Sequence, residues 1–324
     1  MKKKEEQITL EELKERQSWS LTQKIDHSLG VIEEFYTKLN GGGYVSWSGG
    51  KDSTIVYWLA RKLYPDIKAV FCNTGNEYPE IVRFVRSYAN DPNYNVDIIY
   101  PQYKPAEVIA NYGFPLISKD TARLAWYAKH RPDGEMARRA LLPVSEARRF
   151  RIADKWRWLL SEPYDVSSAC CDKLKKEPFH AYSKEHKLYP IVGTMACESE
   201  TRRVAYMQKG KCNTFNNRDK RKQISRPLSI WLEEDIWDCI EKYNIPIADC
   251  YRQGMQRTGC MFCGFGCQFK DDTRLRYVYE HYPKWYNTFL NYTNNGVTYR
   301  EALRKVLAVQ GLTLPDEAQP TLFE

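Results

Sequence analysis

The sequence predicts an α/β fold in which a parallel, twisted sheet is flanked by helices. Short runs rich in β-branched and aromatic residues alternate with helical patterns between residues 44 and 101. Strands that alternate with helices in this way imply a parallel sheet. Apolar residues also recur at three- and four-residue steps before residue 40 and after residue 230, which predicts helical N-terminal and C-terminal extensions.

Turn residues delimit each expected element. We expect strands at 44–47, 67–72, 96–101 and 189–193, and helices at 53–63, 78–90 and 230–243. The triple glycine at 41–43 ends the first helical segment, because glycine is a poor helix former. Ligands of parallel sheets bind beyond the carboxyl ends of the strands, so the segments that follow residues 47 and 72 are candidates for a site.

Composition restricts the class of protein. The 324 residues are 43% hydrophobic and 28% charged, which suits a large core and excludes a disordered or collagen-like chain. No apolar run reaches the roughly 20 residues of a spanning helix, and the charged N-terminus is not a secretory signal peptide. We therefore expect a cytoplasmic protein with no membrane partner. The net charge of +8 fits either a solvated basic surface or an anionic partner.

The strongest local signal is the run SGGKDS between an expected strand and an expected helix. Its residues are Ser48, Gly49, Gly50, Lys51, Asp52 and Ser53. Glycines let the backbone approach a phosphate, and the helix N-terminus adds N–H groups and a positive dipole. Lys51 supplies a charge, and Asp52 can cap the helix or hold Mg²⁺. The spacing is not that of a Walker loop; the alternative is an ordinary glycine-rich turn.

The ten cysteines are unevenly placed, and in a cytosolic chain they should stay reduced. Cys170 and Cys171 are adjacent, and Cys260 and Cys263 form a C-x-x-C motif. Four thiolates suit a [4Fe–4S] cluster or a structural zinc ion. Cys267 is either a replacement for Cys170 as the fourth ligand or a free redox thiol.

These segments together resemble the phosphoadenosine phosphosulfate (PAPS) reductase family of the adenine nucleotide α-hydrolase superfamily, over about residues 40–270. The run SGGKDS is similar to the pyrophosphate-binding loop of the superfamily. The segment Asn73–Glu80 (NTGNEYPE) is similar to the family's second-strand motif, and Gly193–Arg202 is similar to its ES-x-x-R segment.

The resemblance implies a nucleotide site and a division of the chain. The loop with Asn73 and Gly75 would hold ATP or an adenylyl sulfate, with Lys51 and Asp52 as catalytic residues. Glu198 and Arg202 would close the site over the anionic end of the nucleotide. The expected domains are a helical extension at 1–40, a nucleotide-binding α/β domain at 41–230 and a helical region with the C-x-x-C at 231–324.

The resemblance also implies a metal centre. The adenylyl-sulfate reductase branch carries a CC…CxxC pattern that binds a [4Fe–4S] cluster, which would make Cys170, Cys171, Cys260 and Cys263 the ligands here, with zinc as the alternative. Reductases that release sulfite use a cysteine near the C-terminus, and this sequence has none after Cys267. We expect Cys267, or the thiol of a partner protein, to replace it.

Other relatives bind ATP, cleave its α–β bond and pass sulfur to the activated substrate, as the sulfur-transfer subunit of DNA phosphorothioation does. We therefore expect an enzyme of sulfur transfer or reduction that uses a thiol reductant or a sulfur-donor protein. The alternatives are an ATP-pyrophosphatase subunit of a DNA or RNA thiolation complex and a zinc-stabilised nucleotide sensor. Basic and aromatic residues at 119–165 and 218–226 suit a nucleic acid, or a packed core with a solvated helix face.

Overall fold

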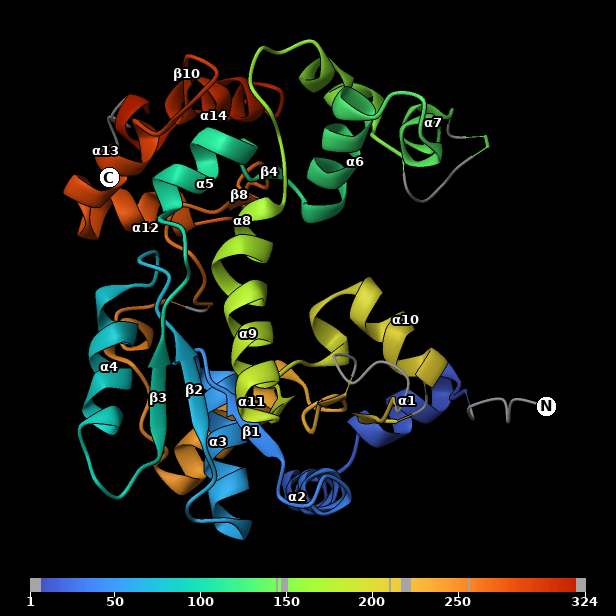
Figure 1. Ribbon diagram of the computed structural model, residues 1–324, viewed down its shortest axis with the longest axis vertical. Helices are drawn as coiled ribbons and strands as arrows, with labels where there is room; N and C mark the ends of the chain where they lie inside the picture. The colour runs from blue at the N-terminus through green and yellow to red at the C-terminus, as the bar shows by residue number, and fades with distance from the viewer. Residues whose placement is uncertain are drawn as a thin grey trace. The chain divides into compact units, whose positions relative to one another are not determined.

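The computed structural model describes residues 7–143, 145–146, 151–209, 211–216, 223–255 and 257–318. The chain forms two compact units, each assembled from segments far apart in the sequence (Figure 1). Unit 1 comprises Met1–Asn73, Tyr78–Tyr100 and Pro178–Thr258, and unit 2 comprises Thr74–Glu77, Pro101–Glu177 and Gly259–Glu324. The expected division into three domains at residues 40 and 230 stays a prediction, because it divides the chain into consecutive segments, whereas the two units are defined by contacts between residues.

Unit 1 is built on a six-stranded sheet in the order β3-β2-β1-β5-β7-β6. The strands are β1 (Gly43–Ser46), β2 (Ala69–Cys72), β3 (Val96–Ile99), β5 (Tyr189–Ile191), β6 (Asn213–Thr214) and β7 (Ile224–Ser225). All neighbours are parallel except β6, which is antiparallel to β7. Val45 pairs with Ala69 on one side and with Ile191 on the other. The expected α/β fold class is thereby confirmed.

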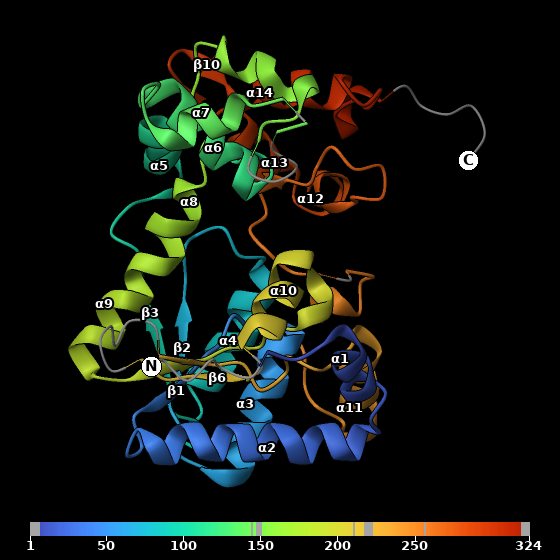
Figure 2. The same cartoon turned by 90° about the vertical axis from the view of Figure 1, so that its right-hand side faces the viewer.

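Helices cover both faces of this sheet. They are α3 (Lys51–Leu63), α4 (Pro79–Ala89) and α9 (Glu177–His186). Tyr44 of β1 packs against Tyr182 of α9. Trp47 follows β1 and contacts Thr54 of α3 and Phe84 of α4, as alternating side-chain directions require. Figure 2 shows α9 on one side of the strands and α3 and α4 on the other. Burial on both faces explains the continuous apolar run of β2.

Among the described residues, unit 1 also contains the helices α1 (Leu10–Gln17), α2 (Leu21–Lys38), α10 (Glu200–Lys209) and α11 (Glu233–Tyr243). Thr9 and Ser20 begin α1 and α2 with capping boxes. The long helix α2 (Figure 2) packs against α3 and α11, and a buried ion pair of 2.6 Å joins Lys24 to Asp235. The helical N-terminal extension is confirmed, and the helix expected at 230–243 begins at Glu233.

Unit 2 is mainly helical. Its helices are α5 (Pro105–Tyr112), α6 (Lys119–His130), α7 (Glu135–Leu141), α8 (Ala169–Cys171), α12 (Arg274–His281), α13 (Pro283–Leu290) and α14 (Tyr299–Ala308), with helical turns at η1 (Asp154–Leu160), η2 (Asp172–Lys176) and η6 (Pro315–Glu317). The short strands β4 (Leu116–Ile117) and β8 (Gly264–Phe265) pair in parallel, and β9 (Thr293–Asn294) pairs antiparallel with β10 (Val297–Thr298). Within the described part of the chain, no helix is both long enough and apolar enough to cross a membrane.

Candidate functional site

The loop Ser48–Ser53 follows the carboxyl end of β1, at the point where the strand order changes direction. From β1 the chain adds β2 and β3 on one side, and it later adds β5 on the other. A switch of this kind leaves a crevice beyond the strand ends, and α/β sheets bind their ligands there. The predicted loop therefore lies where the topology expects a ligand site.

The loop is held by its own hydroxyl groups. The Ser48 N–H donates to Ser53 Oγ at 3.1 Å, and the two serine Oγ atoms lie 2.9 Å apart. Ser53 Oγ donates to the Gly50 carbonyl at 3.0 Å. Gly49 has a φ of 72°, and a Cβ there would lie 2.7 Å from Ile81 Cγ2, so the turn requires glycine. These bonds fix the backbone that leads into the N-terminus of α3, where N–H groups lack helical partners.

Gly193, just after β5, lies directly against the start of α3. A Cβ on Gly193 would come within 2.9 Å of the carbonyl carbon of Asp52 and within 2.9 Å of the Ser53 nitrogen. Real Cβ atoms do not approach backbone atoms so closely. The absence of a side chain at this position thus lets two backbones meet, and it sets the loop between the ends of β1 and β5.

Lys51 is buried and engaged within the chain. Its side chain is 2% exposed, and Nζ lies 3.0 Å from Asp52 Oδ1 and 2.7 Å from Glu233 Oε1. The ammonium also lies 5.7 Å from the ring centre of Trp237. Burial raises the pKa of Asp52, and the charge of Lys51 opposes that rise. The catalytic roles of Lys51 and Asp52 stay predictions. Glu233 and Trp237 were not among the predicted site residues.

Two hydroxyl groups from a distant segment also contact the loop. The Lys51 N–H donates to the hydroxyl of Tyr251, in the helical turn η5 (Asp249–Tyr251), at 2.9 Å. That hydroxyl lies 2.9 Å from Thr258 Oγ1. Burial raises the pKa of Tyr251, so the phenol stays neutral. Neither residue was predicted, because the contact joins positions about 200 residues apart.

Glu198 and Arg202, both predicted site residues, form an ion pair. Glu198, in η3 (Ala196–Glu198), accepts a hydrogen bond from the Met195 N–H at 2.7 Å, and Arg257 Nη2 lies 3.6 Å from its second oxygen. The charges of Glu233 and Glu198 both raise the pKa of Asp52. Glu198 and Glu233 therefore lie near enough to Asp52 for their charges to act on it.

Asn73 and Gly75 follow β2. The Asn73 N–H donates to the Ile99 carbonyl at 2.9 Å, which continues the pairing with β3. Gly75 has a φ of 80°, and a Cβ there would meet only the Pro105 ring, at 4.0 Å. Asn73 belongs to unit 1 and Gly75 to unit 2. Their assignment to the nucleotide stays a prediction.

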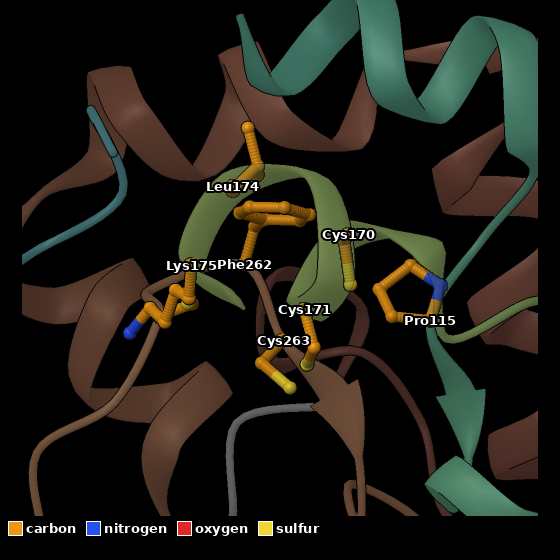
Figure 3. A pocket seen from close by; sticks show the side chains of 8 residues that line it. Pro115, Cys170, Cys171, Leu174, Lys175, Phe262 and Cys263 are labelled. Atoms are coloured by element: carbon orange, nitrogen blue, oxygen red, sulfur yellow. The ribbon is translucent and has the colours of Figure 1, made fainter. Parts of the chain in front are cut away.

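The four cysteines predicted as metal ligands line one pocket of unit 2 (Figure 3). The pocket contains about 290 Å³ of space between atoms, part of it open to solvent. Figure 3 shows the sulfur atoms of Cys170, Cys171 and Cys263 directed toward a common region. The other lining residues are Pro115, Leu174, Lys175, Cys260 and Phe262. The fold thus brings together two cysteine pairs that are about 90 residues apart in the sequence.

The adjacent cysteines differ in their affinity for a proton. A hydrogen bond from Cys170 lowers the pKa of Cys171 to about 6, and nearby lysines contribute to the shift. The same hydrogen bond raises the pKa of Cys170. Burial raises the pKa of Cys260 to about 11. One thiolate is therefore present at neutral pH, and a thiolate is the form that binds metals.

Two cations lie against the C-x-x-C motif, and each has its own carboxylate. Lys175 hydrogen-bonds to Cys260, and its Nζ lies 3.6 Å from Glu77 Oε1. Arg274 hydrogen-bonds to Cys263 and lies 2.6 Å from Asp272. Cations beside thiolates stabilise their negative charge. Lys175 and Arg274 therefore favour the thiolate forms of Cys260 and Cys263.

The donor set agrees with a thiolate-bound metal group in its chemistry, because four sulfur atoms share one pocket with a cationic surround. The side chains are not arranged as a complete set of metal ligands. Among the described residues, no three His, Cys, Asp or Glu side chains are arranged to hold a metal ion. The assignment of a [4Fe–4S] cluster or zinc to these cysteines therefore stays a proposal.

Cys267 lies in the core of unit 2. It is 4% exposed, and burial raises its pKa to about 12. A buried, protonated thiol is a weak nucleophile, so its position lends no support to a catalytic role, which stays a prediction.

The basic and aromatic stretch at 119–165 is largely engaged in contacts of its own. Trp156 is buried, and Trp126 stacks on His130. Several basic side chains pair with carboxylates of the same stretch: Arg123 with Asp120, Lys129 with Asp165, Arg139 with Glu135, and Arg151 and Arg157 with Asp154. In the run Arg218–Arg226, residues 218–222 lie outside the described residues.

Comparison with known proteins gives one family. The family described as "Phosphoadenosine phosphosulfate reductase domain" matches residues 43–264. This range includes the loop, the Glu198–Arg202 segment and all four pocket cysteines.

The curated relatives are distant, and the matched segments cover only part of each of them. Two uncharacterized proteins of Methanocaldococcus jannaschii are 25% and 23% identical over 277 and 276 residues, which cover 82% of this chain and 51% and 45% of theirs. An adenosine 5'-phosphosulfate reductase of Lysinibacillus sphaericus is 31% identical over 106 residues, which cover 32% of this chain and 42% of that protein. The chain thus spans about half the length of the curated relatives it matches.

Solved structures are similar at lower identity. A phosphoadenylyl-sulfate reductase from Candida auris, in a phosphate complex, is 12% identical with a TM-score of 0.42, covering 78% of this chain and 96% of that one. An FMN adenylyltransferase of Candida glabrata in complex with ATP is 13% identical with a TM-score of 0.42, covering 76% of this chain and 67% of that one.

Proposed function

This chain belongs to the phosphoadenosine phosphosulfate reductase domain family, and on that premise we propose that it is an enzyme of sulfur chemistry that acts on an adenine nucleotide. The main support for this proposal is the loop Ser48–Ser53. It is a glycine turn at the switch point of a parallel sheet, it leads into a helix N-terminus, and it is surrounded by hydroxyl groups. These features suit the anionic end of a nucleotide.

The residues around the loop have separate roles in this proposal. The Asp52 and Ser53 N–H groups and the Ser48 hydroxyl bind the anionic group, and Asn73 is assigned to the nucleoside. Lys51, held by Asp52 and Glu233, supplies positive charge, and Asp52 holds Mg²⁺ when the nucleotide is ATP. Glu198 and Arg202 close the site over the anion.

The thiol pocket is the second component of the proposal. Cys170, Cys171, Cys260 and Cys263 would hold a [4Fe–4S] cluster, and zinc on the same thiols is the alternative. A cluster supplies one-electron chemistry when bound. The chain's own contribution is charge: Lys175 and Arg274 stabilise the thiolates, as their hydrogen bonds to Cys260 and Cys263 indicate.

Two reactions are compatible with this site, and their products distinguish them. In the first, an oxygen of the acceptor substrate attacks the α-phosphorus of ATP and pyrophosphate leaves; sulfur from a donor protein then bonds to the adenylated substrate, and AMP leaves. Reduction of an adenylyl sulfate by a thiol reductant releases sulfite and the nucleoside phosphate. Anaerobically purified protein should be incubated with ATP and with adenylyl sulfates, each with a thiol. Release of either product supports the proposal, and release of neither refutes it.

A nucleic-acid-binding ATP-pyrophosphatase subunit of a DNA or RNA thiolation complex is the second candidate. It is favoured by eleven Lys and Arg residues against seven Asp and Glu residues at 119–165. Its support is smaller, because several of these arginines are neutralised by carboxylates within the same stretch. Binding of a labelled oligonucleotide that weakens steeply with salt would favour this candidate; no binding at low salt would exclude it.

A further inference from the structure

The backbone N–H of Lys51 is hydrogen-bonded to a side chain of the same protein. Lys51 is the first residue of α3, so its N–H has no partner within the helix. Such N–H groups are the ones that bind phosphate oxygens at helix N-termini. Here the N–H donates to the Tyr251 hydroxyl at 2.9 Å, which is an ordinary N–H···O distance. An amide carries one hydrogen, so a phosphate oxygen on Lys51 must replace Tyr251.

The space over Gly50 is filled in the same way. A Cβ on Gly50 would meet Thr258 Oγ1 at 2.9 Å and the Tyr251 hydroxyl at 3.2 Å. Glycine in a phosphate loop normally leaves this space to the ligand. The two hydroxyls lie 2.9 Å from each other, so they form one unit over the loop.

Tyr251 is held firmly in this position. It is 8% exposed, and its ring packs edge-on against Trp237 with a centroid distance of 5.9 Å. The same tryptophan lies beside the Lys51 ammonium. The hydroxyl therefore remains at the Lys51 amide unless a better acceptor replaces it.

We propose that Tyr251 is a specificity-determining residue of the loop: its hydroxyl oxygen takes the place of a phosphate oxygen on the Lys51 amide, and only a strongly anionic oxygen exchanges with it. This inference rests on the proposed nucleotide site. A bond from an amide to a phosphate is charge-assisted and about twice as strong as a bond to a neutral hydroxyl. A phosphate or pyrophosphate group therefore displaces Tyr251, whereas water or a sugar hydroxyl does not.

The test is calorimetric titration of the full chain with inorganic pyrophosphate. Tyr251→Phe should tighten binding about threefold to tenfold, because the ligand no longer has to break one hydrogen bond. Thr258→Val should tighten binding by a smaller factor, since Tyr251 then loses its hydroxyl partner but keeps its place. Thermal unfolding of each variant checks that it is folded, and either variant alone suffices for the test.

Tyr44→Phe is the matched control. Tyr44 is buried in the same unit, and its hydroxyl lies 3.1 Å from Ser183 Oγ, so the variant loses a similar hydroxyl pair away from the loop. Its affinity for pyrophosphate should equal that of the wild type. Weaker binding by Tyr251→Phe would show that Tyr251 binds pyrophosphate directly. Unchanged binding would show that the Lys51 amide does not bind pyrophosphate. Both outcomes overturn the inference. Absence of binding in the wild type and in every variant would refute the nucleotide site itself.

Discussion

The phosphate loop and the thiol pocket are built in opposite ways. The loop consists of six consecutive residues, and its internal hydrogen bonds join Ser48, Gly50 and Ser53. The pocket takes its cysteines from α8 and from the segment before β8, and its cations from η2 and α12. A contiguous site carries its geometry in local backbone preferences, whereas an assembled site exists only after distant segments have packed. A single substitution is therefore expected to affect metal binding in the pocket more strongly than nucleotide binding at the loop.

The largest effect is expected in the pocket, because a four-thiolate site needs all its ligands. Cys260→Ser and Cys263→Ser should each lose nearly all bound iron or zinc in anaerobically purified protein, together with any brown colour. Metal analysis and the visible spectrum measure this. Cys267→Ser, which changes a buried thiol of the same segment, should keep its metal. Full metal content in Cys260→Ser would contradict the ligand set.

A smaller loss is expected in the loop, because several donors share the anion. Asp52→Ala and Ser53→Ala should each weaken nucleotide binding at least about tenfold, because the Asp52 carboxylate holds Lys51 and the Ser53 hydroxyl holds the loop backbone in place. Calorimetric titration with ATP and with adenylyl sulfate measures the affinity. Ser87→Ala is the control, because Ser87 is an exposed serine of α4 whose hydroxyl donates to the Phe84 carbonyl of the same helix. Equal affinities in all variants would mean that the loop does not bind the nucleotide.

The loop also depends on one distant contact, with Gly193. Gly193→Ala places a methyl group 2.9 Å from backbone atoms of Asp52 and Ser53. It should lower the free energy of unfolding by about 1–3 kcal/mol and weaken nucleotide binding. Chemical denaturation and titration measure the two effects. Gly30→Ala is the control, because a Cβ there meets nothing within 4 Å and helix α2 should gain stability. A fully stable Gly193→Ala would show that the approach of β5 to the loop is loose.

The smallest effect concerns pH. The pKa of Cys171 is lowered to about 6, so its thiolate is present above that pH and is lost as the pH falls through it. In metal-free protein, alkylation of Cys171 should therefore rise through a midpoint near pH 6 and then level off. Cys260, whose pKa burial raises to about 11, should react slowly until the solution is strongly alkaline. Peptide mass spectrometry follows each residue. If the alkylation of Cys171 had its midpoint near the pKa of an ordinary thiol, Cys171 would not be a thiolate at neutral pH and the prediction would be wrong.

Much of unit 1 could be predicted because its signals are local. The strands β2, β3 and β5 lie within the expected ranges, β1 begins one residue before its expected range, at Gly43, and α3 and α4 differ from expectation by one or two residues. Helix α3 begins at Lys51 rather than Ser53, because the loop closes through Ser53 Oγ onto the Gly50 carbonyl and the helix starts inside the motif. The division into two units was not predictable, since contacts between distant segments decide it.

The sequence by itself determined the alternation of strands and helices, the glycine loop after β1 and the cysteines available for a metal group. Each of these depends on neighbouring residues: side-chain periodicity, turn chemistry and ligand type. Only the tertiary structure decided that Gly193 meets the loop, that Tyr251 bonds to the Lys51 amide, and that Lys175 and Arg274 lie against the C-x-x-C motif. The physical reason is that close approach and burial arise when distant segments pack, and these determine which amides are occupied and which thiols ionise.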